Sequence, residues 1–169
     1  MTTTPLSRAA AQRRRLSLVL VLGLAASLAP AAPAVGERIR LVASLPDGSR
    51  ISLEDARGRR TLLVFWSPAS LAWRKSLGEF ERFAAAPDAA AIHLITVGVN
   101  ADLAGLRNFM AARGARFPFA LRGEDNLGPL EEHRLPLLLV VDADGQLLRH
   151  HTGMFTGRTL RELLDPPAR

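Results

Sequence analysis

The stretch FWSPASLAWRK, residues 65–75, joins an apolar run to an amphipathic segment. The run, TLLVFW at residues 61–66, has no polar alternation, so it predicts a central strand buried on both faces of a sheet. Ser70 is a favourable N-cap residue, and residues 70–86 can place apolar side chains along one side, with Leu71 among them. A buried strand followed directly by a helix is typical of an α/β domain.

Predicted strands and helices also alternate along the rest of the chain. Residues 39–43 and 49–52 flank a Pro-Asp-Gly turn and predict a β-hairpin. Further strands are predicted at residues 92–99, 117–121, 137–141 and 146–151, and helical segments at 52–55, 101–113, 127–133 and 156–164. This order predicts an α/β fold with a mixed central sheet covered on both faces and an N-terminal β-hairpin.

The first 34 residues have the three parts of a signal peptide. Four arginines and no acidic residue precede an apolar run at residues 16–29, and Ala-Pro-Ala at residues 32–34 fits a cleavage site. The run is shorter than the ~20 residues that comfortably span a bilayer. We therefore expect an exported, periplasmic or otherwise extracytoplasmic protein, with residues 35–169 as one domain. The alternative is a leader that remains uncleaved and anchors the domain to the membrane.

Charge gives little support to a nucleic-acid partner. The chain has 22 basic and 16 acidic residues, but four of the arginines lie in the leader, which leaves 18 against 16, or +2, for the domain. No basic stripe with interleaved aromatic residues is present, so nucleic-acid binding is not expected.

Three motifs together resemble the secreted thioredoxin-like redoxin family of TlpA and ResA type. They are LPDGSRISL at residues 45–53, FW at residues 65–66 before a helix, and LP at residues 135–136 before an apolar strand that ends in DADG at residues 142–145. The resemblance implies a thioredoxin-like fold over most of residues 39–164. It also implies that Pro136 is the cis proline that faces the active-site loop, and that relatives act as thiol–disulfide oxidoreductases.

The chain differs from that family at the residues that carry out the reaction. Ser70 and Trp73 stand where the family has its two active-site cysteines, and no cysteine occurs anywhere in the 169 residues. Thiol–disulfide exchange needs a thiolate, so we expect no catalytic residue and no such enzyme activity. Ser70 is interpreted as an N-cap, because no general base follows from the sequence around it. Trp73 either packs in the core or offers an aromatic contact at the surface.

The expected function is binding without catalysis. A groove formed by five residues is the candidate site for another envelope protein or an extended peptide, the latter by strand addition. Its residues are Trp66, Ser70, Trp73, Leu135 and Pro136. Two alternatives remain: a thiol–disulfide oxidoreductase by homology only, and a histidine-dependent metal carrier.

Neither a metal site nor a cofactor is expected. The four histidines have no ligand spacing, and neighbouring histidines on a strand point to opposite faces. They are His93, His133, His150 and His151. Asp142 and Asp144 fit a hairpin turn better than a calcium loop, because the other calcium ligands are missing.

Overall fold

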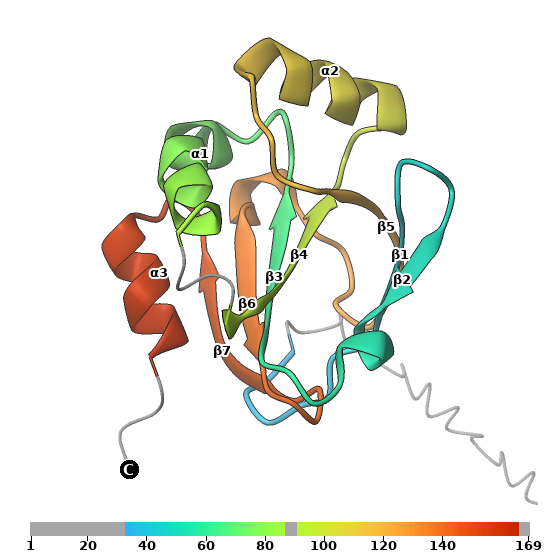
Figure 1. Ribbon diagram of the computed structural model, residues 1–169, viewed down its shortest axis with the longest axis vertical. Helices are drawn as coiled ribbons and strands as arrows, with labels where there is room; N and C mark the ends of the chain where they lie inside the picture. The colour runs from blue at the N-terminus through green and yellow to red at the C-terminus, as the bar shows by residue number, and fades with distance from the viewer. Residues whose placement is uncertain (1–32, 87–90, 166–169) are drawn as a thin grey trace, which may run out of the picture.

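The strand and helix predicted around residues 65–75 form as β3, Thr61–Trp66, and α1, Leu71–Ala84, in a computed structural model of the protein (Figure 1). The structure describes residues 33–86 and 91–165, so the predicted leader lies almost wholly outside it. The other strands are β1 Leu41–Ser44, β2 Arg50–Ser52, β4 His93–Gly98, β5 Ala120–Asp125, β6 Leu137–Val141 and β7 Leu147–Thr152. The other helices are α2 Leu103–Arg113, α3 Gly157–Leu164 and the short 3-10 helices η1 Leu53–Ala56 and η3 Glu132–Arg134.

All seven described strands form one mixed sheet, in the order β2-β1-β5-β4-β3-β6-β7. The pairs β3–β4 and β4–β5 are parallel, and the other four pairs are antiparallel. Every residue of β3 is buried, because this strand has neighbours on both edges and a packed layer on each face. The predicted fold class and the hairpin of β1 and β2 are confirmed.

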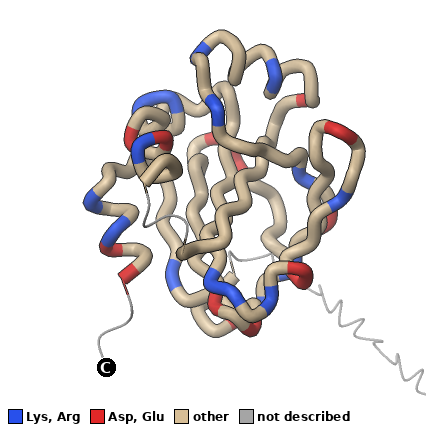
Figure 2. The backbone as a smooth tube through the Cα atoms, viewed as in Figure 1, with Lys and Arg blue, Asp and Glu red and all other residues tan. Residues whose placement is uncertain are grey.

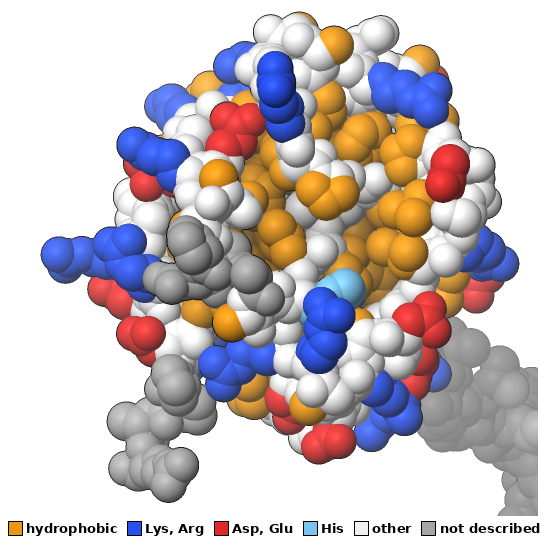
Figure 3. All heavy atoms as spheres, in the orientation of Figure 1, with side chains coloured by type: hydrophobic (Ala, Val, Ile, Leu, Met, Phe, Trp, Pro, Cys, Tyr) orange, Lys and Arg blue, Asp and Glu red, His pale blue; other side chains and the backbone are white. Residues whose placement is uncertain are grey.

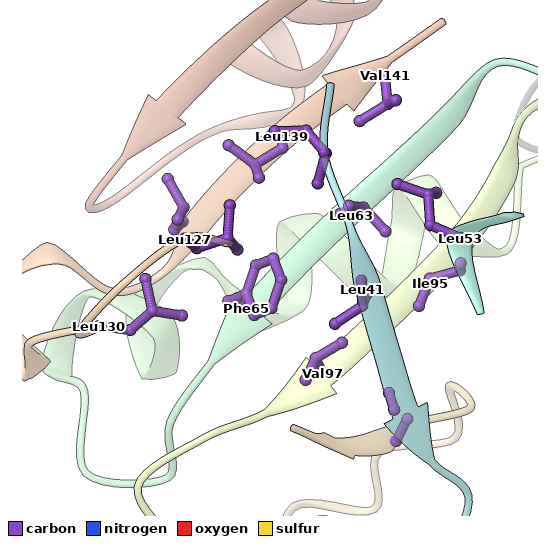
Figure 4. Close-up of a cluster of buried hydrophobic side chains, with 14 of the residues drawn as sticks. Leu41, Leu53, Leu63, Phe65, Ile95, Val97, Leu127, Leu130, Leu139 and Val141 are labelled. Atoms are coloured by element: carbon purple, nitrogen blue, oxygen red, sulfur yellow. The ribbon is translucent and has the colours of Figure 1, made fainter. Parts of the chain in front are cut away.

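The sheet separates two hydrophobic cores. On one face Leu63 and Phe65 of β3 meet side chains from η1, β1 and the segment that carries Leu127 and Leu130 (Figure 4). On the other face the core takes residues from α1, α2 and α3, including Trp73 and Leu106. The alternation of side chains along β3 assigns neighbouring residues to opposite cores.

Local signals fix most of the element ends. Asp102 accepts a hydrogen bond from the Gly105 amide at the start of α2, and Gly114 ends that helix in the left-handed conformation, with φ of 63°. The helix predicted at residues 127–133 is wrong in extent. Only Glu132–Arg134 is helical, because Gly128 has a positive φ of 69° and Pro129 follows it.

The surface carries charges of both signs. Lys and Arg positions and Asp and Glu positions are both spread along the described part of the chain (Figure 2). Within residues 33–86 and 91–165, no helix is both long enough and apolar enough to cross a membrane.

Candidate functional site

Ser70 lies at the N-terminus of α1 and makes two hydrogen bonds through one hydroxyl group. Its Oγ accepts from the Trp73 amide at 3.2 Å and donates to the Leu135 carbonyl at 2.8 Å. The residue is only 4% exposed. Ser70 is therefore the predicted N-cap of α1, and it also fastens this helix to the loop before β6.

The loop before β6 has the cis bond that the resemblance implied, between Leu135 and Pro136. The Leu135 amide donates to the Glu132 carbonyl at 3.2 Å, while its own carbonyl accepts from Ser70. The Pro136 carbonyl accepts from the Gly153 amide at 2.9 Å. Because these backbone groups already have partners within the chain, a peptide gains little by adding here as a strand.

Trp66 and Trp73 form one stacked pair inside the core. Their ring centroids are 5.4 Å apart with an angle of 24° between the planes, and both side chains are fully buried. Phe80 and Phe117 pack against the Trp73 ring, with centroids 5.3 and 5.8 Å away. Of the two interpretations of Trp73, core packing describes its position, so its ring is not at the surface.

The accessible part of the site is a hollow of about 560 Å³ over the first turn of α1. Leu71 is 59% exposed and Met154 is 60% exposed, and both line this hollow together with atoms of Ser70 and Leu135. Lys75 and the segment of η3 form the rest of its wall. The hollow is large enough for an apolar side chain, and no thiol lines it.

The five predicted groove residues, Trp66, Ser70, Trp73, Leu135 and Pro136, are all buried, so they do not form an open groove as expected. Ser70 contacts Leu135, and Trp66 stacks on Trp73, as separate pairs. Sequence patterns missed Leu71 and Met154 as surface residues. Leu71 was expected to face the core, but it is the first residue of α1 and is exposed, while Trp73 two residues later is fully buried.

The histidines have separate neighbours. His93 Nδ1 lies 2.6 Å from Arg59 Nη2, His133 Nδ1 lies 3.4 Å from Glu131, and His151 Nε2 lies 3.1 Å from the Met154 carbonyl. Among the described residues, no group of three His, Cys, Asp or Glu side chains could hold a metal ion.

The loop after β6 has the geometry of a turn. The Asp142 carboxylate accepts from the amides of Asp144 and Gln146, at 2.9 and 2.8 Å. These bonds explain the Asp-Ala-Asp-Gly sequence without a bound cation, because a short side-chain acceptor is what such a turn needs.

No family model matches the chain. Over 124 residues it is 22% identical to the thiol-disulfide oxidoreductase ResA of Bacillus subtilis, which covers 70% of this chain and 67% of ResA. StoA from Bacillus subtilis has a similar structure, with a TM-score of 0.58 and 23% identity over 79% of this chain and 100% of StoA. A secreted disulfide oxidoreductase of Mycobacterium tuberculosis gives a TM-score of 0.57 at 15% identity, over 72% of this chain and 91% of its own. The chain therefore has a thioredoxin-like fold, is similar in sequence to the thiol–disulfide oxidoreductase ResA, and contains no cysteine.

Proposed function

We propose that this protein is an exported, non-catalytic binding protein that holds an apolar segment of another envelope protein in the hollow over the first turn of α1. The observation that carries the proposal concerns exposed apolar side chains. Val35, Leu71 and Met154 are the large hydrophobic residues that are exposed in the described part of the chain, and two of these three line the same hollow. Clustered apolar exposure of this kind marks interaction sites.

The missing cysteines exclude the chemistry of the relatives. A chain without a thiol can neither attack a disulfide nor carry one. The cis-proline loop and the helix N-terminus nevertheless remain in contact through Ser70 and Leu135. This contact supports a role in which the surface around the helix N-terminus binds a partner and does not transfer electrons.

The backbone geometry favours recognition by side chains. Since the amide and carbonyl of Leu135 are engaged, we expect a partner to insert an apolar residue between Leu71 and Met154. Insertion of a side chain takes the place of strand addition, which the sequence had led us to expect, because the backbone groups of Leu135 and Pro136 already have partners. Export is supported by the sequence of the leader and by the secreted disulfide oxidoreductase among the similar structures.

The test is a comparison of three exposed positions. The exported protein, with a C-terminal tag, is used to capture proteins from the envelope fraction, and Kd is then measured for each purified partner. Leu71→Glu combined with Met154→Glu should weaken binding by about tenfold or more, as expected for apolar residues at the centre of an interface. Val35→Glu changes an equally exposed residue elsewhere and should leave Kd unchanged, and so should added reductant. Equal binding by all variants would refute the proposal.

A further inference from the structure

Met154 places an oxidisable sulfur at the hollow over the first turn of α1. It is 60% exposed and lines that hollow with Leu71, whereas Met110 in α2 is only 7% exposed. The chain has three methionines, of which Met1 lies outside the described residues, and no cysteine, so no thiolate competes for an oxidant. Among the residues that the structure describes, Met154 is therefore the sulfur that an oxidant reaches most easily.

The backbone around Met154 is held by hydrogen bonds to three parts of the fold. The Gly153 amide donates to the carbonyl of the cis proline at 2.9 Å. The Phe155 amide donates at 2.9 Å to Oγ of Ser76, a fully buried residue of α1. The Met154 carbonyl accepts from His151 Nε2 at 3.1 Å. Because Phe155 occupies the core at the next position, these bonds keep the Met154 side chain at the surface.

Oxidation at Met154 affects one apolar surface and spares another. Hydrophobic side chains also gather on the face shown in Figure 3, between α1 and the β1–β2 hairpin. Two hollows of about 630 and 270 Å³ lie on that face, and the described residues that line them include no methionine. A change at the sulfur of Met154 therefore alters the hollow over the first turn of α1 and leaves that face as it is.

We propose that Met154 is an oxidation site at which a hydroperoxide weakens the binding of the partner. This inference rests on the proposed function, because it assigns a means of regulation to the same hollow. One oxygen atom of the peroxide is transferred to Sδ: the O–O bond breaks, an S–O bond forms, and water or an alcohol leaves. The thioether is oxidised to the sulfoxide, and the peroxide is reduced. Since a sulfoxide is polar, it is a poor neighbour for an apolar residue inserted beside Leu71.

The first measurement tests the site and needs no partner. The full exported chain is treated with increasing amounts of hydrogen peroxide, and the sulfoxide at each methionine is measured by peptide mass spectrometry. In the folded protein Met154 should be oxidised at least about fivefold faster than Met110, because burial keeps the oxidant away from Met110. In concentrated urea the two rates should become similar. Equal rates in the folded protein would overturn the proposed site.

The second measurement tests the effect on binding. Peroxide treatment of the native chain should raise Kd for the purified partner by at least about tenfold, and a methionine sulfoxide reductase should restore it. Met154→Leu removes the oxidisable sulfur, so peroxide should leave the Kd of this variant unchanged. Met110→Leu should respond to peroxide as the native chain does. An unchanged Kd after full oxidation of Met154, or an equal loss in Met154→Leu, would overturn the inference.

Failure of this inference and failure of the proposed function give different results. If no partner is captured, or if Leu71→Glu with Met154→Glu leaves Kd unchanged, the proposed function is wrong and no binding is left for oxidation to regulate. If that double variant weakens binding but peroxide does not, the proposed function stands and the regulation through Met154 is wrong.

Discussion

Ser70 replaces a reactive group with a structural one, because its single hydroxyl joins α1 to the cis-proline loop. Ser70→Ala leaves the Leu135 carbonyl and the Trp73 amide without this partner in a buried place. We expect the free energy of unfolding to fall by about 1–3 kcal/mol, measured by urea denaturation. Ser49→Ala removes an exposed hydroxyl in the β1–β2 turn and should change the free energy of unfolding by less than about 0.5 kcal/mol. Equal losses in the two variants would contradict this role.

His93 makes stability depend on pH. Burial lowers the pKa of this imidazole, and the positive charge of Arg59 lowers it further. As pH falls below the ordinary histidine pKa of about 6.5, the unfolded chain takes up the proton first, so the free energy of unfolding decreases until the folded-state pKa is passed. Arg59→Gln should raise the pKa of His93 in an NMR titration of the ring, with His93→Gln to assign the signal. An unchanged or lower pKa would contradict the effect of Arg59.

Among the helices and strands, Gly98 lies where a helix packs closely on the sheet, and Gly78 lies where a helix has open space beside it. A Cβ at Gly98 in β4 would lie 2.6 Å from Leu106 Cδ2 of α2, whereas one at Gly78 in α1 would meet nothing within 4 Å. Gly98→Ala should lower the free energy of unfolding by about 1–3 kcal/mol, and Gly78→Ala should raise it by about 0.5–1 kcal/mol. Urea denaturation measures both changes, and Gly98→Ala with Leu106→Ala should lose less than the sum of the single losses. Strict additivity would show that the contact is absent.

Most strands and helix starts could be predicted from the sequence. Apolar runs such as residues 61–66 and 137–141 specify buried strands, and Ser70 and Asp102 mark helix starts by local chemistry. The segment at residues 127–133 was mispredicted because the backbone conformation at Gly128 outweighed its apolar pattern. The bond from Ser70 to Leu135 spans 65 positions along the chain. Only the packed fold fixes such a contact, and so the exposure of Leu71 and Met154 could not be predicted either.

For the whole molecule, the absence of cysteine has direct consequences for both activity and stability. Noncovalent interactions alone hold the domain, since no disulfide can form. The urea midpoint should be the same with and without reductant, and a disulfide-reductase assay should give the rate of the blank. Turnover above the blank that depends on this protein would contradict the proposed loss of redox chemistry.

The stacked tryptophans also make the protein its own optical probe. The chain contains two tryptophans and no tyrosine, so nearly all of its near-ultraviolet absorption and emission comes from Trp66 and Trp73. These indoles lie 5.4 Å apart, fully shielded from water, directly beneath the Ser70 cap. Emission from the folded protein should therefore be shifted to short wavelength. A change in that spectrum reports on the packing under the cap, so any ligand or substitution that disturbs it becomes visible without a label.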